Sequence, residues 1–128
     1  MIKTFSMVFI LAFTSVSPQD VLWPTQMNKI FSSNFGENRD DHFHMGVDIK
    51  TGGKIGIEVL AVEDGYISRL RSNYTGYGKA IYLRTISGHE VVYAHLESFT
   101  PVLEKVWRLQ QGKRKSYMVD TQFSPRDF

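Results

Sequence analysis

The sequence contains no cysteine among its 128 residues. This absence excludes a disulfide framework and a lipid-modified cysteine anchor. A large charge of either sign is also missing, because 15 lysines and arginines stand against 13 aspartates and glutamates, for a formal net charge of +2. So small and evenly spread a charge argues against nucleic acid as a partner, although a weakly basic surface suits an acidic polymer.

Long apolar runs are scarce, and the most marked one lies at the N-terminus. Residues 1–17 hold one charge, Lys3, followed by the apolar run 5–13 and then small polar residues. This layout is typical of a secretory signal peptide, and the run is too short for a transmembrane helix, which needs about 20 apolar residues. A buried N-terminal strand is the alternative. The pattern predicts a secreted, periplasmic or envelope-associated protein with no stable membrane insertion after cleavage, in which residues 18–128 form one domain.

Short segments separated by glycine-containing turns dominate the middle of the chain. Residues 66–71 alternate apolar and polar side chains, which is typical of a half-buried strand. Strands of this length joined by short turns indicate an antiparallel meander. The segments expected to form strands are residues 30–35, 66–71, 79–84, 90–96 and 117–123.

Residues 101–115 do not follow this pattern of short strands and turns. Apolar side chains recur there at spacings of three and four, and Pro101 suits the first turn of a helix. We expect a helix that ends near Gly112, with the basic run 113–115 as a solvated helix end that interacts favourably with the helix dipole. The sequence therefore predicts a mainly β fold with one helical insert.

Two imidazoles and a carboxylate lie within residues 42–48. His44 and Asp48 are the candidate metal ligands, because histidine nitrogen and carboxylate oxygen both bind Zn²⁺. In a straight strand, residues four apart would lie roughly 13 Å from each other at ~3.3 Å per residue, so the backbone must bend. Gly46 is expected to supply this bend through a positive φ, in a loop that enters a strand. By itself a His-x-x-x-Asp spacing is a weak sign of a metal site.

A larger pattern surrounds this pair. Its five motifs, in order, are SNFGENR at 33–39, HMGVDIK at 44–50, AVEDGYI at 61–67, GYGK at 76–79 and YAHL at 93–96. From about residue 24 onward the chain thus resembles the lysostaphin-type zinc endopeptidases, and most of all their periplasmic members with a helical insert after the Tyr-x-His-Leu motif. The resemblance implies a small open antiparallel β-sandwich of the duplicated hybrid motif type. It also implies an enzyme that cuts the peptide cross-links of bacterial peptidoglycan.

The resemblance further implies roles for three residues. His44 and Asp48 match the first two zinc ligands, and His95 matches a catalytic histidine that faces the metal without binding it. A zinc-held water would attack the peptide carbonyl, and His95 would assist proton transfer or stabilise the oxyanion, since imidazole exchanges protons near neutral pH. His42 is expected to hydrogen-bond near the ligands or line the cleft. His89 follows a turn and is expected to be exposed.

One part of the family pattern is missing from the chain. The third zinc ligand and a second catalytic histidine come from a His-x-His motif near the C-terminal end of the domain, yet no histidine follows His95. Two protein ligands rarely hold a catalytic zinc, so the 128-residue chain by itself is not expected to be active. We favour the interpretation that it is a portion of a longer enzyme, truncated before this motif. A natural short form that has lost catalysis is the alternative.

Two other functions stay open beside the leading prediction of a monomeric zinc endopeptidase that acts on peptidoglycan peptides. A non-catalytic module would keep the cleft and either bind peptidoglycan or activate an amidase. A carbohydrate-binding or structural β-sandwich would use exposed aromatic rings for sugar stacking, although aromatics at alternating strand positions are more often part of a core. The tyrosines considered for stacking are Tyr74, Tyr77, Tyr82 and Tyr93. The loops 51–57 and 72–78 are expected to set substrate choice.

Overall fold

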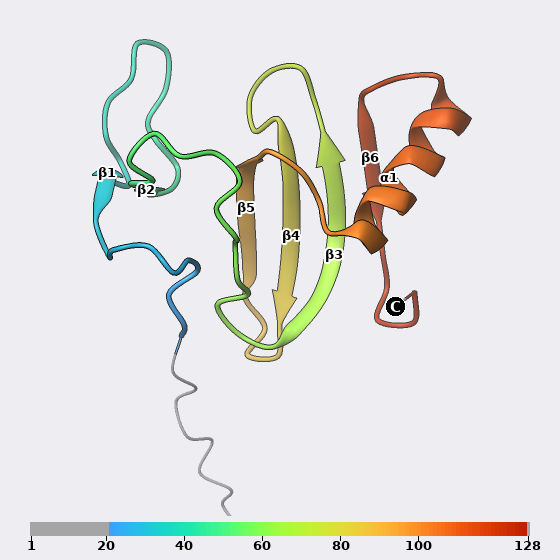
Figure 1. Cartoon of the computed structure of the whole chain (residues 1–128), viewed down its shortest axis with the longest axis horizontal. Coiled ribbons are helices and arrows are strands. Elements are labelled where there is room, and N and C mark those ends of the chain that lie inside the picture. The colour runs from blue at the N-terminus through green and yellow to red at the C-terminus, as the bar shows by residue number, and fades with distance from the viewer. Residues whose placement is uncertain (1–20, 128) are drawn as a thin grey trace, which may run out of the picture.

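The computed structural model describes residues 21–127, which form two antiparallel sheets and one helix (Figure 1). The elements are β1 (Phe31–Ser33), β2 (Asp48–Ile49), β3 (Gly65–Ser72), β4 (Lys79–Thr85), β5 (Glu90–Leu96), α1 (Pro101–Arg114) and β6 (Val119–Gln122). This architecture confirms the predicted mainly β class with open antiparallel sheets and one helix. The predicted signal peptide, residues 1–17, lies outside the described residues. Within residues 21–127, no helix has the length and apolarity needed to cross a membrane.

The larger sheet has the strand order β5-β4-β3-β6, and every pair in it is antiparallel. Strands β3, β4 and β5 follow one another as the predicted meander, and β6 returns to the free edge of β3. Glycine is required where β3 begins, since a Cβ atom at Gly65 would lie 2.2 Å from the carbonyl oxygen of Arg84 on β4. The strands of this sheet lie close to the segments that alternation and turns in the sequence predict.

Helix α1 packs against one face of this sheet and closes the main core. It begins at Pro101, and Trp107 on its inner side donates from Nε1 to the hydroxyl oxygen of Ser72 at 2.8 Å. The buried side chains of this core are Leu70, Phe99, Leu103, Trp107 and Val119. The helix ends at Arg114, two residues beyond the predicted end. Lys115 follows in the left-handed conformation, with φ of 51°, and its N–H reaches the carbonyl oxygen of Gln111.

The smaller sheet consists of β1 and β2, which lie on the β5 side of the larger sheet (Figure 1). In the segment before β1, the centroid of the Trp23 ring lies 5.4 Å from that of the Phe31 ring. The carbonyl oxygen of Pro24 accepts from the N–H of Leu60 at 2.8 Å. Together these contacts fasten the segment to the body of the protein.

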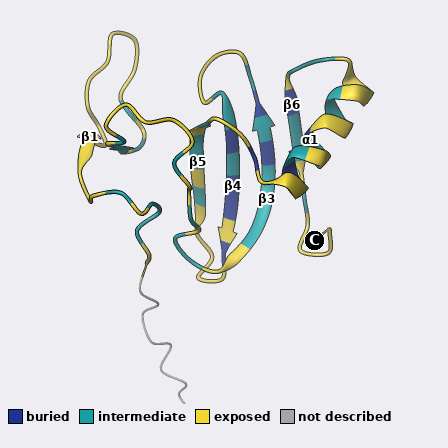
Figure 2. Cartoon of the chain, in the orientation of Figure 1, coloured by how far each residue is buried: buried dark blue, intermediate teal, exposed yellow. Residues whose placement is uncertain are grey.

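Burial differs sharply between the two sheets. Buried residues concentrate on β3, β4 and the inner side of α1, whereas most of the chain around β1 is exposed (Figure 2). The large apolar side chains left exposed between residues 21 and 59 are Val21, Leu22, Ile30, Phe31, Phe35, Phe43, Met45, Val47, Ile55 and Val59. The smaller sheet therefore buries little apolar surface, and polar contacts matter correspondingly more for its geometry.

Candidate active site

The side chains of His44 and Asp48 lie close together, as two ligands of one metal ion must. Nε2 of His44 is 3.3 Å from Oδ1 of Asp48, and the two side chains are 15% and 39% exposed. The other ring nitrogen, Nδ1, lies 3.0 Å from the carbonyl oxygen of Asn34. A backbone carbonyl at one imidazole nitrogen fixes the ring orientation and favours the other nitrogen for a metal. The pair thus presents one nitrogen and one oxygen to a common position.

The backbone bends at Gly46 as predicted, but the predicted positive φ is wrong, because this glycine does not have one. Residues 43, 45 and 47 are exposed while 44, 46 and 48 are partly buried, so His44 and Asp48 lie on the same side of a stretch that bends at residue 46. A Cβ atom at position 46 would lie 3.8 Å from Nε2 of His44. The glycine therefore leaves open the space between the two side chains.

Backbone pairing holds the two ends of this stretch. The N–H of His44 donates to the carbonyl oxygen of Glu37 at 2.8 Å, and the carbonyl oxygen of His44 accepts from Gly36 at 2.7 Å. At the other end, Asp48 on β2 pairs with Ser33 on β1. These contacts hold both ends of the stretch, and the bend at Gly46 lies between them.

A buried hydroxyl joins the surrounding polar groups. Ser33 is 8% exposed, and its Oγ lies 3.0 Å from Nδ1 of His44. Arg39 donates from Nη2 to the same Oγ at 2.9 Å and also to Oδ2 of Asp48 at 2.9 Å. The Ser33 hydroxyl also donates to the Glu37 carboxylate, and this bond is the main cause of a lowered pKa at Glu37. The sequence did not predict these contacts, although Ser33, Glu37 and Arg39 all belong to the motif at 33–39.

His42 does not pair with His44 or Asp48. Its Nδ1 pairs with the carboxylate of Asp41, and its side chain is 60% exposed. The hydrogen bond from His42 is the main cause of a lowered pKa at Asp41. Within residues 21–127, no hydrogen bond or ion pair joins His42 to His44 or Asp48.

His95 is exposed at the end of β5, on the larger sheet. Its φ is 57°, a left-handed conformation that is uncommon for residues other than glycine. The register of β4 and β5 shifts between Lys79 and Ile81, so that residues 94–95 together lie opposite one residue of β4. Such a bulge redirects side chains and is frequent next to active sites. The ring of His95 meets that of Tyr77 edge-on, with centroids 6.4 Å apart.

The three predicted residues thus occupy two separate sheets. His44 and Asp48 are brought together at the smaller one, whereas His95 lies on the larger one. No hydrogen bond or ion pair in the described part of the chain links His95 to either of them. Between the sheets, Tyr93 on β5 accepts at its hydroxyl oxygen from the N–H of Val62 at 2.9 Å, and burial raises the pKa of this tyrosine.

The donor set fits part of a zinc site. A histidine nitrogen and a carboxylate oxygen are suitable ligands, and their facing atoms are arranged to share an ion. No group of three or more histidine, aspartate or glutamate side chains that could hold a metal occurs within residues 21–127. His44 and Asp48 could therefore occupy two ligand positions, and residues 21–127 contain no third side chain grouped with them.

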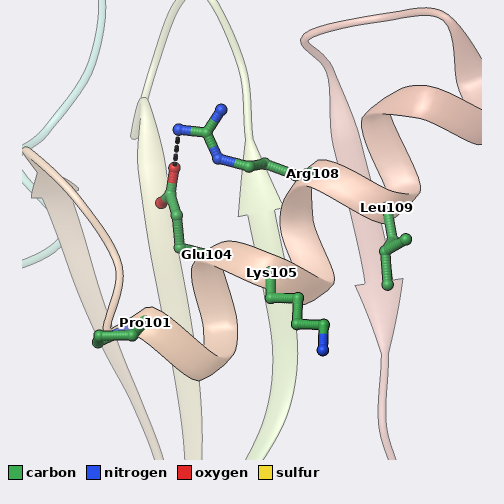
Figure 3. Close-up of a pocket in the computed structure, with 5 residues that line it drawn as sticks. All are labelled: Pro101, Glu104, Lys105, Arg108 and Leu109. Carbon is green, nitrogen blue, oxygen red and sulfur yellow. Dashed lines mark ion pairs between the residues drawn. The ribbon is translucent and has the colours of Figure 1, made fainter.

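A depression on the outer side of α1 lies apart from these residues (Figure 3). Glu104 and Arg108 form an ion pair across it at 3.2 Å. Its lining residues are Pro101, Glu104, Lys105, Arg108 and Leu109. It contains none of the predicted site residues, so we do not identify it as the active site.

Open antiparallel sheets that carry a His-x-x-x-Asp pair and a histidine at a bulged strand end agree with the resemblance to lysostaphin-type domains. The model described as Peptidase family M23 matches residues 42–126, and the chain belongs to this family. Its members are zinc-dependent and act on peptidoglycan in the cell wall. The matched segment contains His44, Asp48 and His95, whereas Ser33 and Arg39 precede it. No curated protein and no solved structure matches the chain.

Proposed function

We propose that this protein is a zinc-dependent endopeptidase that cleaves peptide cross-links of bacterial peptidoglycan in the cell envelope. The observation that carries the proposal is the approach of His44 Nε2 to Asp48 Oδ1 at 3.3 Å, inside the segment that matches family M23. In this proposal residues 1–17 direct export as a signal peptide, and the enzyme is a monomer of the periplasmic type.

Each predicted site residue has a distinct task in this proposal. Nε2 of His44 and Oδ1 of Asp48 hold zinc, which when bound supplies Lewis-acid activation of a water and of the scissile carbonyl. His95 moves a proton or donates a hydrogen bond to the developing oxyanion, as imidazole can do near neutral pH. The bulge at the end of β5 and the edge contact with Tyr77 set the position of its ring.

Release of soluble peptides from purified peptidoglycan sacculi tests this function. A longer form of the protein that supplies the third ligand should, with zinc, release cross-link fragments detectable by liquid chromatography and mass spectrometry, and His44→Ala and Asp48→Ala in that form should abolish the release. His42→Ala is the matched control, since His42 lies two residues away and contacts neither ligand. Unchanged release by His44→Ala would contradict the assignment of the site.

The proposed site needs one protein donor more than residues 21–127 supply. We propose that this donor comes from outside these residues, in a longer form of the protein. The intact mass of the protein isolated from its native host tests this proposal. A mature species clearly heavier than 14.7 kDa would support it, whereas one at or below this mass would contradict it.

The same shortage of donors favours a second candidate function. A non-catalytic module with an incomplete site would bind peptidoglycan, or activate an amidase, without cutting peptides. Sedimentation with sacculi tests this alternative. Binding that persists with a chelator and is accompanied by no peptide release would favour the module, whereas zinc-dependent release would favour the peptidase.

A further inference from the structure

We propose that Ser33 and Arg39 are positioning residues that hold His44 and Asp48 in the geometry needed to bind a metal ion. The inference rests on the proposed function of this pair as metal ligands. It concerns side chains that belong neither to the pair nor to the segment matched by the family model. Neither of them donates an atom to the ion.

The contacts form a closed ring of four side chains. Starting at Nδ1 of His44, the ring passes to Oγ of Ser33 at 3.0 Å and from there to Nη2 of Arg39 at 2.9 Å. It continues to Oδ2 of Asp48 at 2.9 Å and closes through Oδ1 of Asp48, 3.3 Å from Nε2 of His44. Each ligand is thus held at one polar atom while the other faces its partner, and Ser33 shares the hold on Nδ1 of His44 with the carbonyl oxygen of Asn34 at 3.0 Å.

This arrangement lowers the entropic cost of binding an ion. A free imidazole and a free carboxylate must each lose rotamer freedom when they bind, whereas side chains already held by hydrogen bonds lose less. Partners of this kind around metal ligands typically contribute about 10- to 100-fold to metal affinity. We therefore expect the ring to act on zinc affinity.

The burial of Ser33 indicates that its hydroxyl is more than an exposed polar group. Ser33 is the one buried residue of β1 and β2, at 8% exposure, and it lies opposite Asp48 in the pairing of these strands. A buried hydroxyl needs hydrogen-bond partners, and those of Ser33 include His44 and Arg39. The backbone pairing therefore carries this hydroxyl to the place where both ligands can be held.

The charge of Arg39 opposes its geometric effect. A guanidinium beside the site repels a cation, so removing its charge would by itself strengthen metal binding. Arg39→Lys keeps the charge but loses the planar group whose Nη2 reaches both Ser33 and Asp48. Ser33→Ala changes no charge either, so the two variants isolate the effect of the hydrogen bonds.

The test measures the zinc dissociation constant of the longer form of the protein, in which the proposed site is complete, by competition with a chromophoric chelator. Arg39→Lys should weaken binding about 10-fold or more, and Ser33→Ala should weaken it in the same direction. Arg84→Lys is the matched control, because Arg84 forms a comparably exposed ion pair with Glu90 at 3.1 Å on the larger sheet. This control should bind zinc as the wild type does. Urea unfolding of each metal-free variant identifies any general loss of stability.

A second readout needs no metal. The ring resonances of His44 in nuclear magnetic resonance spectra of the metal-free protein should shift or broaden in Arg39→Lys and Ser33→Ala, and stay unchanged in Arg84→Lys. A purely structural role would lower stability in urea and leave both the zinc affinity of the folded protein and these resonances as they are.

The outcomes separate this inference from the proposed function. Wild-type zinc affinity in both Arg39→Lys and Ser33→Ala would overturn the inference and leave the proposed function standing. Failure of the wild-type protein to bind zinc at all, or equal binding by His44→Ala, would overturn both. Weakened binding in the two ring variants but not in Arg84→Lys would support the inference.

Discussion

The backbone N–H of His95 donates to the carbonyl oxygen of Tyr77 at 2.9 Å. This bond ties the predicted catalytic histidine to the loop between β3 and β4. It also helps to hold His95 at a φ of 57°, where a residue with a Cβ atom is strained by about 1–2 kcal/mol. Strained backbone of this kind clusters at functional sites, which adds a reason to test this histidine.

Replacement of His95 should separate its chemistry from its backbone. Asparagine tolerates the left-handed region, so His95→Asn should keep the free energy of unfolding within about 0.5 kcal/mol of wild type. If His95 transfers a proton, peptide release from sacculi should fall about 10²- to 10⁴-fold in an active form of the protein. Urea unfolding and the release assay check the two effects. His89→Asn, at an exposed turn, is the control, and undiminished release by His95→Asn would refute the catalytic role.

Glycine at position 115 should stabilise the protein. Lys115 follows α1 with φ of 51°, which glycine adopts without strain, so Lys115→Gly should raise the free energy of unfolding by about 0.5–1 kcal/mol. Lys113→Gly provides the comparison, since Lys113 lies within the helix and glycine there should lower stability by about 1 kcal/mol. Thermal and urea unfolding measure both changes. Equal signs for the two substitutions would contradict this explanation.

Loss of the Ser72 hydroxyl should damage the main core. This side chain is fully buried, accepts from Trp107 Nε1 at 2.8 Å and donates to the carbonyl oxygen of Tyr117 at 2.6 Å. Ser72→Ala leaves buried polar groups without a partner, which should lower the free energy of unfolding by about 2–3 kcal/mol. Tryptophan fluorescence during urea unfolding reports the loss. The exposed Ser98→Ala should change stability by less than about 0.5 kcal/mol.

The ion pair between β3 and β6 should contribute stability that depends on pH. Nε of Arg69 donates to Oδ1 of Asp120 at 2.7 Å, and this hydrogen bond is the main cause of a lowered pKa at Asp120. Because the folded pKa lies below the unfolded value of about 3.9, the contribution is present above that pH and is lost as the pH falls through the folded pKa.

Asp120→Asn tests this dependence. Both side chains of the pair are partly exposed, so we expect the substitution to lower stability by only about 1 kcal/mol or less at neutral pH. The difference from wild type should shrink as the pH falls below about 4. Urea unfolding across the acid range measures it, with Asp40→Asn, in an exposed turn, as the control for net charge. A difference independent of pH would show that lost packing outweighs lost charge.

The larger sheet and the helix could be predicted because their signals are local. Alternation along residues 66–71 and the turns after it predict β3, β4 and β5, and Pro101 with its apolar spacing predicts α1. The burial of each side chain could not be predicted from local signals. Tyr82 is buried at 8% exposure whereas Tyr74 is 75% exposed, because burial depends on which face α1 and the loops cover.

For the candidate site, the sequence indicated the ligands but not what holds them. His44 and Asp48 were identified from their residue types, their spacing and a resemblance. The contacts of Ser33 depend on pairing between β1 and β2, which are three and two residues long and leave no periodic signal. At Gly46 the sequence predicts the bend but not its φ, and pairing with residues earlier in the chain holds both ends of that bend.

The separation of the two sheets has a consequence for motion. A two-stranded sheet that buries little apolar surface is only marginally stable, whereas the larger sheet is held by a helix and a core. We therefore expect amide hydrogens of β1 and β2 to exchange with solvent through local opening, at a free energy well below that of β3 and β4. The smaller sheet, with His44 and Asp48, would then open locally while the larger sheet holds His95 in place. A bound ion would therefore protect β1 and β2 from exchange more than it protects the rest of the molecule.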